Sequence, residues 1–396
     1  MLYKFFSRKN TSTHPKNAFP EKSNVSLVHA GKEFFTVLKK MIDEAESCIH
    51  LQTYIFGDDD TGKFVANALK NAVKRNVAVH LLVDGFASQS LSKEFVHELK
   101  EAGIHFRFFE PLLRSKHFYF GRRLHHKVVV VDKRKALVGS MNIADRYNDL
   151  PGSRAWLDMA LYIEGSACEK LDNICWDLWD KKQISPTRDE TEKRSSGKMH
   201  NVALRIRRND WVRSKQDITK TYKAFFRVAE KDISIVCSYF LPGRTIRALL
   251  KQAASRGVNV KIVLAQKSDV KTAKNAERYL YRWLLRSNIK VYEYKPAVLH
   301  AKFVIVDEHL LTLGSCNLNQ LSAYASIELN IDIKDEPFAA ALQKEVNMLI
   351  DKDCERIDLS SYNTPLFSFK QLVQWSSYIF LRVLLAVFTF YYRQGE

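Results

Sequence analysis

The sequence predicts an α/β fold of two related halves, each a mixed β-sheet flanked by helices. Its clearest support is a duplicated stretch: "LHHKVVVVDKRKALVGSMN" from Leu124 to Asn142 and "LHAKFVIVDEHLLTLGSCN" from Leu299 to Asn317. Both follow the pattern H-x-K, four apolar residues, D, six residues, then G-S-x-N. At ordinary residue frequencies, one chance match in a chain this long is roughly a one-in-ten-thousand event. Two matches indicate an internal repeat.

The repeat extends to the segments that precede each motif. Ala45–Phe56 reads "AESCIHLQTYIF", and Ala229–Phe240 reads "AEKDISIVCSYF". Each is followed by a helical pattern, "GKFVANALKNAVKR" or "RTIRALLKQAASR", and then by a short apolar strand at Val79–Val83 or Val260–Leu264. Strand–helix–strand units of this kind predict a parallel or mixed sheet in each half.

Length and composition divide the chain into two domains and their connections. The 396 residues, 46% of them hydrophobic, suffice for two domains with separate cores and exclude a disordered protein. The stretch from Asp180 to Asn201 is polar, charged and nearly free of large apolar residues, which indicates a linker. We expect a basic N-terminal tail over 1–24, the first domain over 25–180, the linker over 181–201, the second domain over 202–360 and an apolar helix over 366–393.

The C-terminal stretch Leu372–Arg393 is apolar apart from one narrow stripe. On a helical wheel this stripe contains Gln371, Tyr378, Arg382, Thr389 and Arg393. Arg382 at the centre of a bilayer would cost about 2.5–3.5 kcal/mol. We therefore expect the helix to lie in the membrane interface with the stripe toward water. The alternatives are a membrane-spanning helix and a helix buried in the core or in a dimer interface.

The net charge and the cysteine content limit the possible binding partners and the cellular compartment of the protein. A net charge of +18 suits nucleic acid and an anionic membrane surface about equally. The apolar C-terminal helix favours the membrane surface, and no base-stacking module or recognition helix supports nucleic acid. The 6 cysteines show no C-x-x-C spacing and no zinc pattern, which indicates buried thiols in a reducing compartment. We expect peripheral or monotopic attachment to a cell membrane, at its cytoplasmic face.

The motifs place histidine and lysine side chains together. Because alternate residues of a strand point the same way, His125 shares a face with Lys127, and His300 shares a face with Lys302. Lysines supply positive charge for phosphate oxygens, and a histidine can attack when neutral or donate a proton when charged. A phosphodiester held between two such pairs can be cleaved by covalent catalysis. No carboxylate cluster suited to magnesium lies near either motif in the sequence, so we expect no metal and no other cofactor.

The remaining motif residues receive different roles. Asp132 and Asp307 fall on the opposite strand face from the lysines, so we expect them to fix the local fold although they belong to the motif. His126 has the same parity and is expected to be structural. The G-S-x-N turns bring small side chains and an amide close to the lysine heads. We expect phosphate contacts from Ser140, Asn142, Ser315 and Asn317.

Two copies of this pattern in one chain resemble the phospholipase D superfamily. The flanking stretches "HLQTYIFGDDDTG", "FYFGRRLHHKVVVVD" and "AWLDMALYIEG" are similar to short-form bacterial cardiolipin synthases, and the resemblance covers about residues 25 to 350. It implies one active site shared by two domains, with phosphatidyl transfer through a phosphohistidine. It also implies attack by His125, acid–base work by His300, and membership of Asp132 and Asp307 in the catalytic motif.

The resemblance further implies two acidic residues that orient the histidines. Glu328, in "SIELNIDI", matches the acidic residue of the superfamily, and Asp158, in "AWLDMALYI", is its counterpart in the first half. Alternatively, Asp158 and Glu328 are strand residues that face solvent and have no role in the site. The expected function is transfer of a phosphatidyl group from phosphatidylglycerol to a second phospholipid or alcohol. Hydrolysis by the same residues, a nuclease of the superfamily and an inactive membrane scaffold are the competing interpretations.

Overall fold

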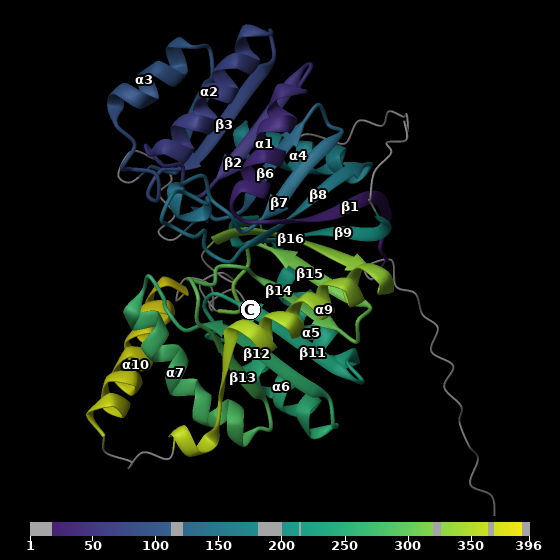
Figure 1. Ribbon diagram of the computed structural model, residues 1–396, viewed down its shortest axis with the longest axis vertical. Helices are drawn as coiled ribbons and strands as arrows, with labels where there is room; N and C mark the ends of the chain where they lie inside the picture. Colours follow the sequence, from purple (N-terminus) through teal and green to yellow (C-terminus); the bar gives the residue numbers. More distant parts are fainter. Residues whose placement is uncertain are drawn as a thin grey trace, which may run out of the picture.

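The computed structural model describes residues 18–111, 122–180, 200–213, 215–319, 326–362 and 368–389. The first half lies at the top of Figure 1 and the second half below it. In chain order the first half contains β1 (Glu21–His29), α1 (Lys32–Asp43), β2 (Cys48–Thr53), α2 (Asp60–Lys74), β3 (Ala78–Asp84), α3 (Lys93–Glu101), β4 (His105–Phe109), β5 (Arg123–Leu124), β6 (Lys127–Val131), β7 (Lys135–Gly139), β8 (Met159–Gly165) and α4 (Ala167–Trp179).

The second half repeats most of this order of elements and adds a few others. It contains β9 (His200–Asp210), β10 (Lys215–Gln216), α5 (Asp217–Val228), β11 (Asp232–Cys237), α6 (Arg244–Ser255), β12 (Asn259–Ala265), α7 (Lys271–Arg286), β13 (Lys290–Tyr294), β14 (Phe303–Val306), β15 (Leu310–Gly314), β16 (Ser326–Lys334), α9 (Glu336–Asp353), β17 (Cys354–Ile357) and α10 (Phe369–Thr389). The strands and helices expected before each motif are confirmed as β2–α2–β3 and β11–α6–β12.

The two halves form one mixed sheet, whereas the sequence leads us to expect a separate sheet in each. Hydrogen-bonded neighbours follow the order β4-β3-β2-β6-β7-β8-β1-β9-β16-β15-β14-β11-β12-β13-β17. The β2–β3–β4 and β11–β12–β13 pairings are parallel, and the others in this order are antiparallel. The halves join where β1 pairs with β9, because each strand would otherwise leave an unpaired edge.

The core has one part in each half and a third part between them. Helices α1, α2 and α3 cover one face of the first half, and their apolar side chains pack against β2, β3 and β6. Helices α5, α6 and α7 do the same for the second half. A further apolar cluster joins residues of both halves, including Val128 and Val130 of β6 and Phe303 and Ile305 of β14. Side chains of α4 and α9 belong to this shared cluster, which fixes the two halves against each other.

The observed boundaries differ slightly from the expected ones. Strand β1 begins at Glu21, within the expected tail, and β9 begins at His200, within the expected linker. Both strands pair in the central sheet, so these residues belong to the folded halves. Residues 1–17 of the expected tail and 181–199 of the expected linker lie outside the described residues.

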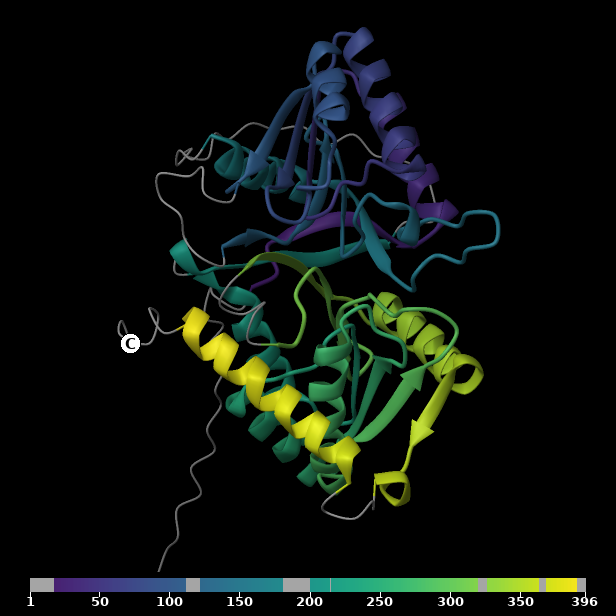
Figure 2. The ribbon, with the colours of Figure 1, turned by 90° about the vertical axis from the view of Figure 1, so that its left-hand side faces the viewer.

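Helix α10 lies along the outside of the second half, against α7 (Figure 2). Of the expected polar stripe, Tyr378 faces the protein and not water, because it is buried and packs on Tyr279 of α7, while Arg382 is exposed. Gln374, outside that stripe, is also buried. Arg393 lies outside the described residues. The apolar side is exposed: Phe369 is 81% accessible, Leu372 58%, and Phe380 58%. Among the described residues, no helix combines the length and the apolar character needed to cross a bilayer.

Candidate active site

Backbone pairing between the halves brings the two motifs together. The N–H of His125 donates to the carbonyl of Ile327 on β16 (3.0 Å), and β5 runs parallel to the start of β16. In the second half, the N–H of His300 donates to the carbonyl of Leu157 (2.8 Å), just before β8. Each motif histidine is therefore held by the strand that leads to the acidic residue of the other half.

The side chains repeat this crossed arrangement. Nδ1 of His125 donates to Oε2 of Glu328 (2.9 Å), and Nδ1 of His300 donates to Oδ2 of Asp158 (2.7 Å). Both carboxylates are buried. An ionised carboxylate only accepts hydrogen bonds, so the proton of each neutral imidazole lies on Nδ1 and the lone pair lies on Nε2. Each pair thus presents a basic nitrogen from one half that is oriented by a carboxylate of the other half.

The glycine and serine of each motif position these carboxylates. A Cβ at Gly314 would lie 2.2 Å from the carbonyl oxygen of Leu329, and one at Gly139 would lie 2.7 Å from that of Met159. Only glycine allows this close approach of neighbouring strands. The next residue then reaches the carboxylate, since the hydroxyl of Ser140 donates to Asp158 and that of Ser315 donates to Glu328.

These contacts change the expected role of the two serines. We expected Ser140 and Ser315 to contact phosphate, yet both are buried and bonded to the carboxylates that orient the histidines. Burial tends to raise the pKa of Asp158, but His300, Lys302 and Ser140 outweigh it and hold that pKa below its ordinary value. The carboxylate is therefore ionised at neutral pH, as the orientation of His300 requires.

The motif lysines lie beside the histidines with their charges poorly solvated. Lys127 Nζ donates to the carbonyl of His125, and Lys302 Nζ donates to that of His300. Burial lowers the pKa of Lys127 to about 7, against the opposing effect of Glu328, and burial also lowers the pKa of Lys302. The proximity of Lys302 lowers the pKa of Lys127 further. An anion between them would restore both charges.

Burial also keeps the two histidines neutral. It lowers the pKa of His125 although Glu328 acts in the opposite direction. It lowers the pKa of His300 to about 3, with a further contribution from Lys302, against the effect of Asp158. A neutral imidazole with a free Nε2 is the form that attacks phosphorus or accepts a proton.

The motif asparagines fix the loops that follow β2 and β11. Oδ1 of Asn142 accepts from the N–H of Ile55 (3.1 Å), and its amide donates to the hydroxyl of Tyr147 (2.8 Å). Oδ1 of Asn317 accepts from the N–H of Tyr239 (3.3 Å). With the oxygen held by the backbone, the NH₂ group of each asparagine is the end available for donation.

The motif aspartates lie at the far end of their strands, away from the histidines. Asp132 accepts from the backbone N–H groups of Glu46, Ser47 and Cys48 (2.8–2.9 Å). Asp307 accepts from Glu230, Lys231 and Asp232 in the same way. Both have positive φ, near 52°, which aspartate tolerates better than most residues. They tie the turns that follow β6 and β14 to the starts of β2 and β11, which is consistent with the structural role that their parity predicts.

His126 also lies on the face away from the site. It is buried, and its Nε2 bonds to Oε1 of Gln52 (2.8 Å), whose amide donates to the carbonyl of Cys175 (2.8 Å). This network connects β2 with α4. It is consistent with the structural role that strand parity predicts for His126.

Three aromatic residues of the site were not predicted from the sequence. The ring of Tyr54 packs edge-on against His125 (4.8 Å between centroids), while Tyr147 and Trp156 pack against His300 (5.2 and 5.9 Å). The hydroxyl of Tyr147 lies 3.5 Å from Nε2 of His300. Tyr54 aligns with Ser238 in the duplicated stretches, and Tyr147 and Trp156 lie outside the two motifs, so the repeat gives no signal for any of the three.

Comparisons with known proteins agree with this architecture. The family model described as "Cardiolipin synthase, PLD-like domain" matches residues 38–179 and 222–350. Cardiolipin synthase B of Escherichia coli (strain K12) is 32% identical over 353 residues, which cover 87% of this chain and 84% of that protein. A cardiolipin synthase of Halalkalibacterium halodurans is 31% identical over 322 residues, 78% of this chain and 62% of that protein.

A solved structure shows the same fold at low sequence identity. Phosphatidylserine synthase of Haemophilus influenzae superposes with a TM-score of 0.71 at 16% identity, over 93% of this chain and 96% of that one. The family model matches more than half of this chain in two separate segments, one in each half. The chain therefore belongs to the phospholipase D-like cardiolipin synthase family and is a phosphatidyltransferase of that superfamily.

Proposed function

We propose that the enzyme transfers a phosphatidyl group from phosphatidylglycerol to a second phospholipid or alcohol through a phosphohistidine. The observation that carries this proposal is the pair of crossed contacts, His125 to Glu328 and His300 to Asp158, which make Nε2 the basic nitrogen of each histidine. Two equivalent basic nitrogens suit a reaction in two displacement steps, in which one nitrogen carries the phosphatidyl group and the other moves protons.

In the first step, Nε2 of His125 attacks phosphorus and the bond from phosphorus to the glycerol headgroup oxygen breaks. His300, protonated in the complex, donates its proton to that oxygen, so free glycerol leaves. In the second step, His300 accepts the proton of the acceptor hydroxyl, whose oxygen attacks phosphorus. The P–N bond then breaks and its electrons return to His125. The same histidine serves as acid and then as base, so the enzyme ends in its starting state.

The lysines and asparagines account for charge stabilisation during both steps. Charge on the non-bridging oxygens rises as the new bond forms, and Lys127 and Lys302 supply buried positive charge there. A phosphodiester anion raises the pKa of both lysines, and it also raises the pKa of His300 toward the range in which it can donate a proton. The NH₂ groups of Asn317 and of Asn142, which also donates to the hydroxyl of Tyr147, would donate to the same oxygens.

The acceptor distinguishes transfer from hydrolysis. Water in place of an alcohol would give a phospholipase D reaction with the same residues. Helix α10 favours a lipid acceptor, because its exposed apolar side would hold the site at a membrane surface where hydroxylated lipids are abundant. We accordingly propose peripheral attachment to a membrane through α10, at the cytoplasmic face.

Lipid analysis tests this proposal directly. Cells without their own cardiolipin synthases would express the parent chain or the His125→Ala variant, and lipid extracts would be analysed by mass spectrometry. We expect cardiolipin only with the parent chain. Purified enzyme on phosphatidylglycerol vesicles should release glycerol and cardiolipin in equal amounts. Phosphatidic acid as the main product would identify a hydrolase instead.

A further inference from the structure

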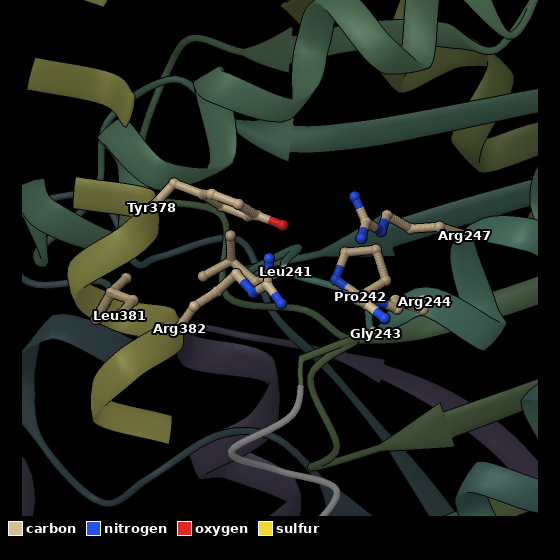
Figure 3. Close-up of a pocket in the computed structure, with 8 residues that line it drawn as sticks. All are labelled: Leu241, Pro242, Gly243, Arg244, Arg247, Tyr378, Leu381 and Arg382. Carbon is tan, nitrogen blue, oxygen red and sulfur yellow. The ribbon is translucent and has the colours of Figure 1, made fainter. Parts of the chain in front are cut away.

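A pocket lined by arginines lies where α10 passes the N-terminal end of α6 (Figure 3). Arg244 and Arg247 come from α6, while Tyr378 and Arg382 come from α10, and the hydroxyl of Tyr378 points toward Arg247. The remaining lining residues are Leu241, Pro242, Gly243 and Leu381. No acidic side chain is among these lining residues. We call this site the arginine pocket.

The positive charges of the arginine pocket are not neutralised within the part of the chain that the structure describes. None of its three arginines forms an ion pair with a described carboxylate. Arg247 lies over the ring of Trp283 (5.7 Å) and Arg382 over that of Tyr378 (5.6 Å), and Nε of Arg247 is buried without a hydrogen-bond partner. Three guanidinium groups that line one pocket provide donors suited to an anion that bridges them.

The start of α6 adds to the attraction for an anion. The residue at its N-cap is Gly243, which has no side chain to accept from the first N–H groups, and its first turn contains no acidic residue. These N–H groups and the helix dipole therefore remain available to a negatively charged oxygen. By contrast, α2 and α9 are capped by the carboxylates of Asp59 and Asp335.

The surface beside the arginine pocket is apolar. On α10, Trp375 is 47% exposed, and Ile379, Phe380 and Val383 are exposed close to Arg382 along the helix. An exposed apolar face of this kind requires a partner. A ligand that fits both features has a negatively charged group next to extended apolar chains, which describes an anionic phospholipid in a membrane.

The arginine pocket lies near the active site but is separate from it. The loop that forms one wall begins at Tyr239, whose N–H donates to Asn317, and continues to Leu241, whose N–H donates to the carbonyl of Leu318 (3.0 Å). A lipid bound in this pocket would thus place the membrane surface beside the second motif. The reacting phosphate would instead lie between Lys127 and Lys302.

We propose that the arginine pocket binds the phosphate of an anionic phospholipid that does not react, while its acyl chains lie along the apolar face of α10. The inference rests on the proposed function, because it assumes an enzyme that works at a lipid surface. It adds a second lipid site to the reacting one and makes membrane binding depend on anionic lipid. This site would keep the enzyme on membranes that contain its anionic substrate or product.

Vesicle binding by the full chain tests the inference. Parent protein and the triple variant Arg244→Gln, Arg247→Gln, Arg382→Gln would be sedimented with phosphatidylcholine vesicles that contain either no phosphatidylglycerol or roughly 30 mol% of it. The matched control replaces three exposed lysines of the first half that form no ion pair with a described carboxylate: Lys74→Gln, Lys93→Gln, Lys100→Gln. Thermal unfolding would establish that all three proteins are folded.

We expect phosphatidylglycerol to strengthen binding of the parent, and the triple arginine variant to lose this gain by roughly tenfold or more. The lysine control should lose less than about threefold, as expected for screened charges far from the membrane. Equal losses in both variants would mean that only overall charge matters and would overturn the inference, as would an undiminished gain in the arginine variant.

Turnover of soluble substrate separates this inference from the proposed function. On monomeric short-chain phosphatidylglycerol, the arginine variant should match the parent, because its catalytic histidines and lysines are intact. Activity lost on vesicles and kept on soluble lipid supports the second site. If the parent itself has no transfer activity on soluble lipid or vesicles but binds anionic vesicles through the arginine pocket, the proposed function fails and the lipid site stands. If the arginine variant loses activity on soluble lipid as well, the arginine pocket belongs to the reaction and the inference is wrong.

Discussion

The crossed contact between His125 and Glu328 provides the sharpest test of the mechanism. In the Glu328→Gln variant the side chain keeps its size, but the buried charge that orients Nδ1 of His125 (2.9 Å) is removed. Hydrogen bonds to charged groups contribute about 1.5–3 kcal/mol. At about 1.36 kcal/mol for each factor of ten, the expected loss in kcat/KM is roughly 10- to 150-fold.

The loss of kcat/KM stays within this range of roughly 10- to 150-fold if His125 keeps its proton on Nδ1. An amide can also turn its NH₂ group toward Nδ1, which would move the proton to Nε2 and remove the attacking lone pair. In a comparable histidine–carboxylate pair of another enzyme, the wrong tautomer costs about 10⁴-fold. Glu328 is fully buried and held by Ser315, so solvent cannot replace the missing charge.

The measurement is the single-turnover rate of adduct formation, together with steady-state transfer from phosphatidylglycerol. Glu328→Gln should slow adduct formation, since it acts on the attacking histidine, whereas Asp158→Asn should act on proton transfer through His300. A suitable control is Asp332→Asn on the same strand, because this buried carboxylate bonds to Arg205 (2.8 Å) and Thr221 (2.7 Å) and not to a motif histidine or lysine. The control should lower thermal stability and leave the turnover of folded enzyme intact. A folded Glu328→Gln enzyme within about threefold of the parent rate would refute the reasoning.

Four further outcomes follow from the same structure. Because burial lowers the pKa of Lys127 to about 7, affinity for inorganic phosphate should fall as pH rises through 7, when the lysine loses its proton; an inhibition constant independent of pH would contradict this. Excess EDTA should leave turnover unchanged once effects on lipid packing are controlled, and a strict need for magnesium would contradict charge stabilisation by the lysines. Gly314→Ala should destabilise the fold by about 1–3 kcal/mol, measured by denaturant unfolding, because its Cβ would lie 2.2 Å from a backbone oxygen. Deletion of residues 366–396 should release the enzyme from membranes with both halves folded, and full sedimentation with membranes at high salt would exclude α10 as the anchor.

The repeated sequence predicts the local elements well because they depend on nearby residues. The strand expected at Val79–Val83 is β3, one residue longer at each end, and the strand expected at Val260–Leu264 is likewise extended in β12. The strand parity of His125 and Lys127 also follows from the local pattern. These strands and side-chain directions depend on residues a few positions apart, and the repeat shows each pattern twice.

Contacts between segments far apart in the chain could not be predicted from the sequence. His125 and Glu328 are 203 positions apart, and nothing in either motif says which histidine each carboxylate serves. The single sheet depends on pairing between β1 and β9, which no pattern in these strands specifies. The helical wheel of α10 places Tyr378 toward water because the wheel does not include α7. The burial of Tyr378 against Tyr279 of α7 leaves apolar side chains of α10 exposed.

Because of the crossed contacts, each half carries one catalytic histidine and the carboxylate that orients the histidine of the other half. A fragment that ends at Trp179 would contain His125 and Asp158, the carboxylate that orients His300. A fragment that starts at His200 would contain His300 and Glu328, the carboxylate that orients His125. Each fragment alone would therefore be inert, whatever its own stability. Mixed together, they could restore two complete histidine–carboxylate pairs by annealing β1 to β9. Product formation by such a split enzyme would measure assembly of the fragments, because joining the halves also completes both histidine–carboxylate pairs.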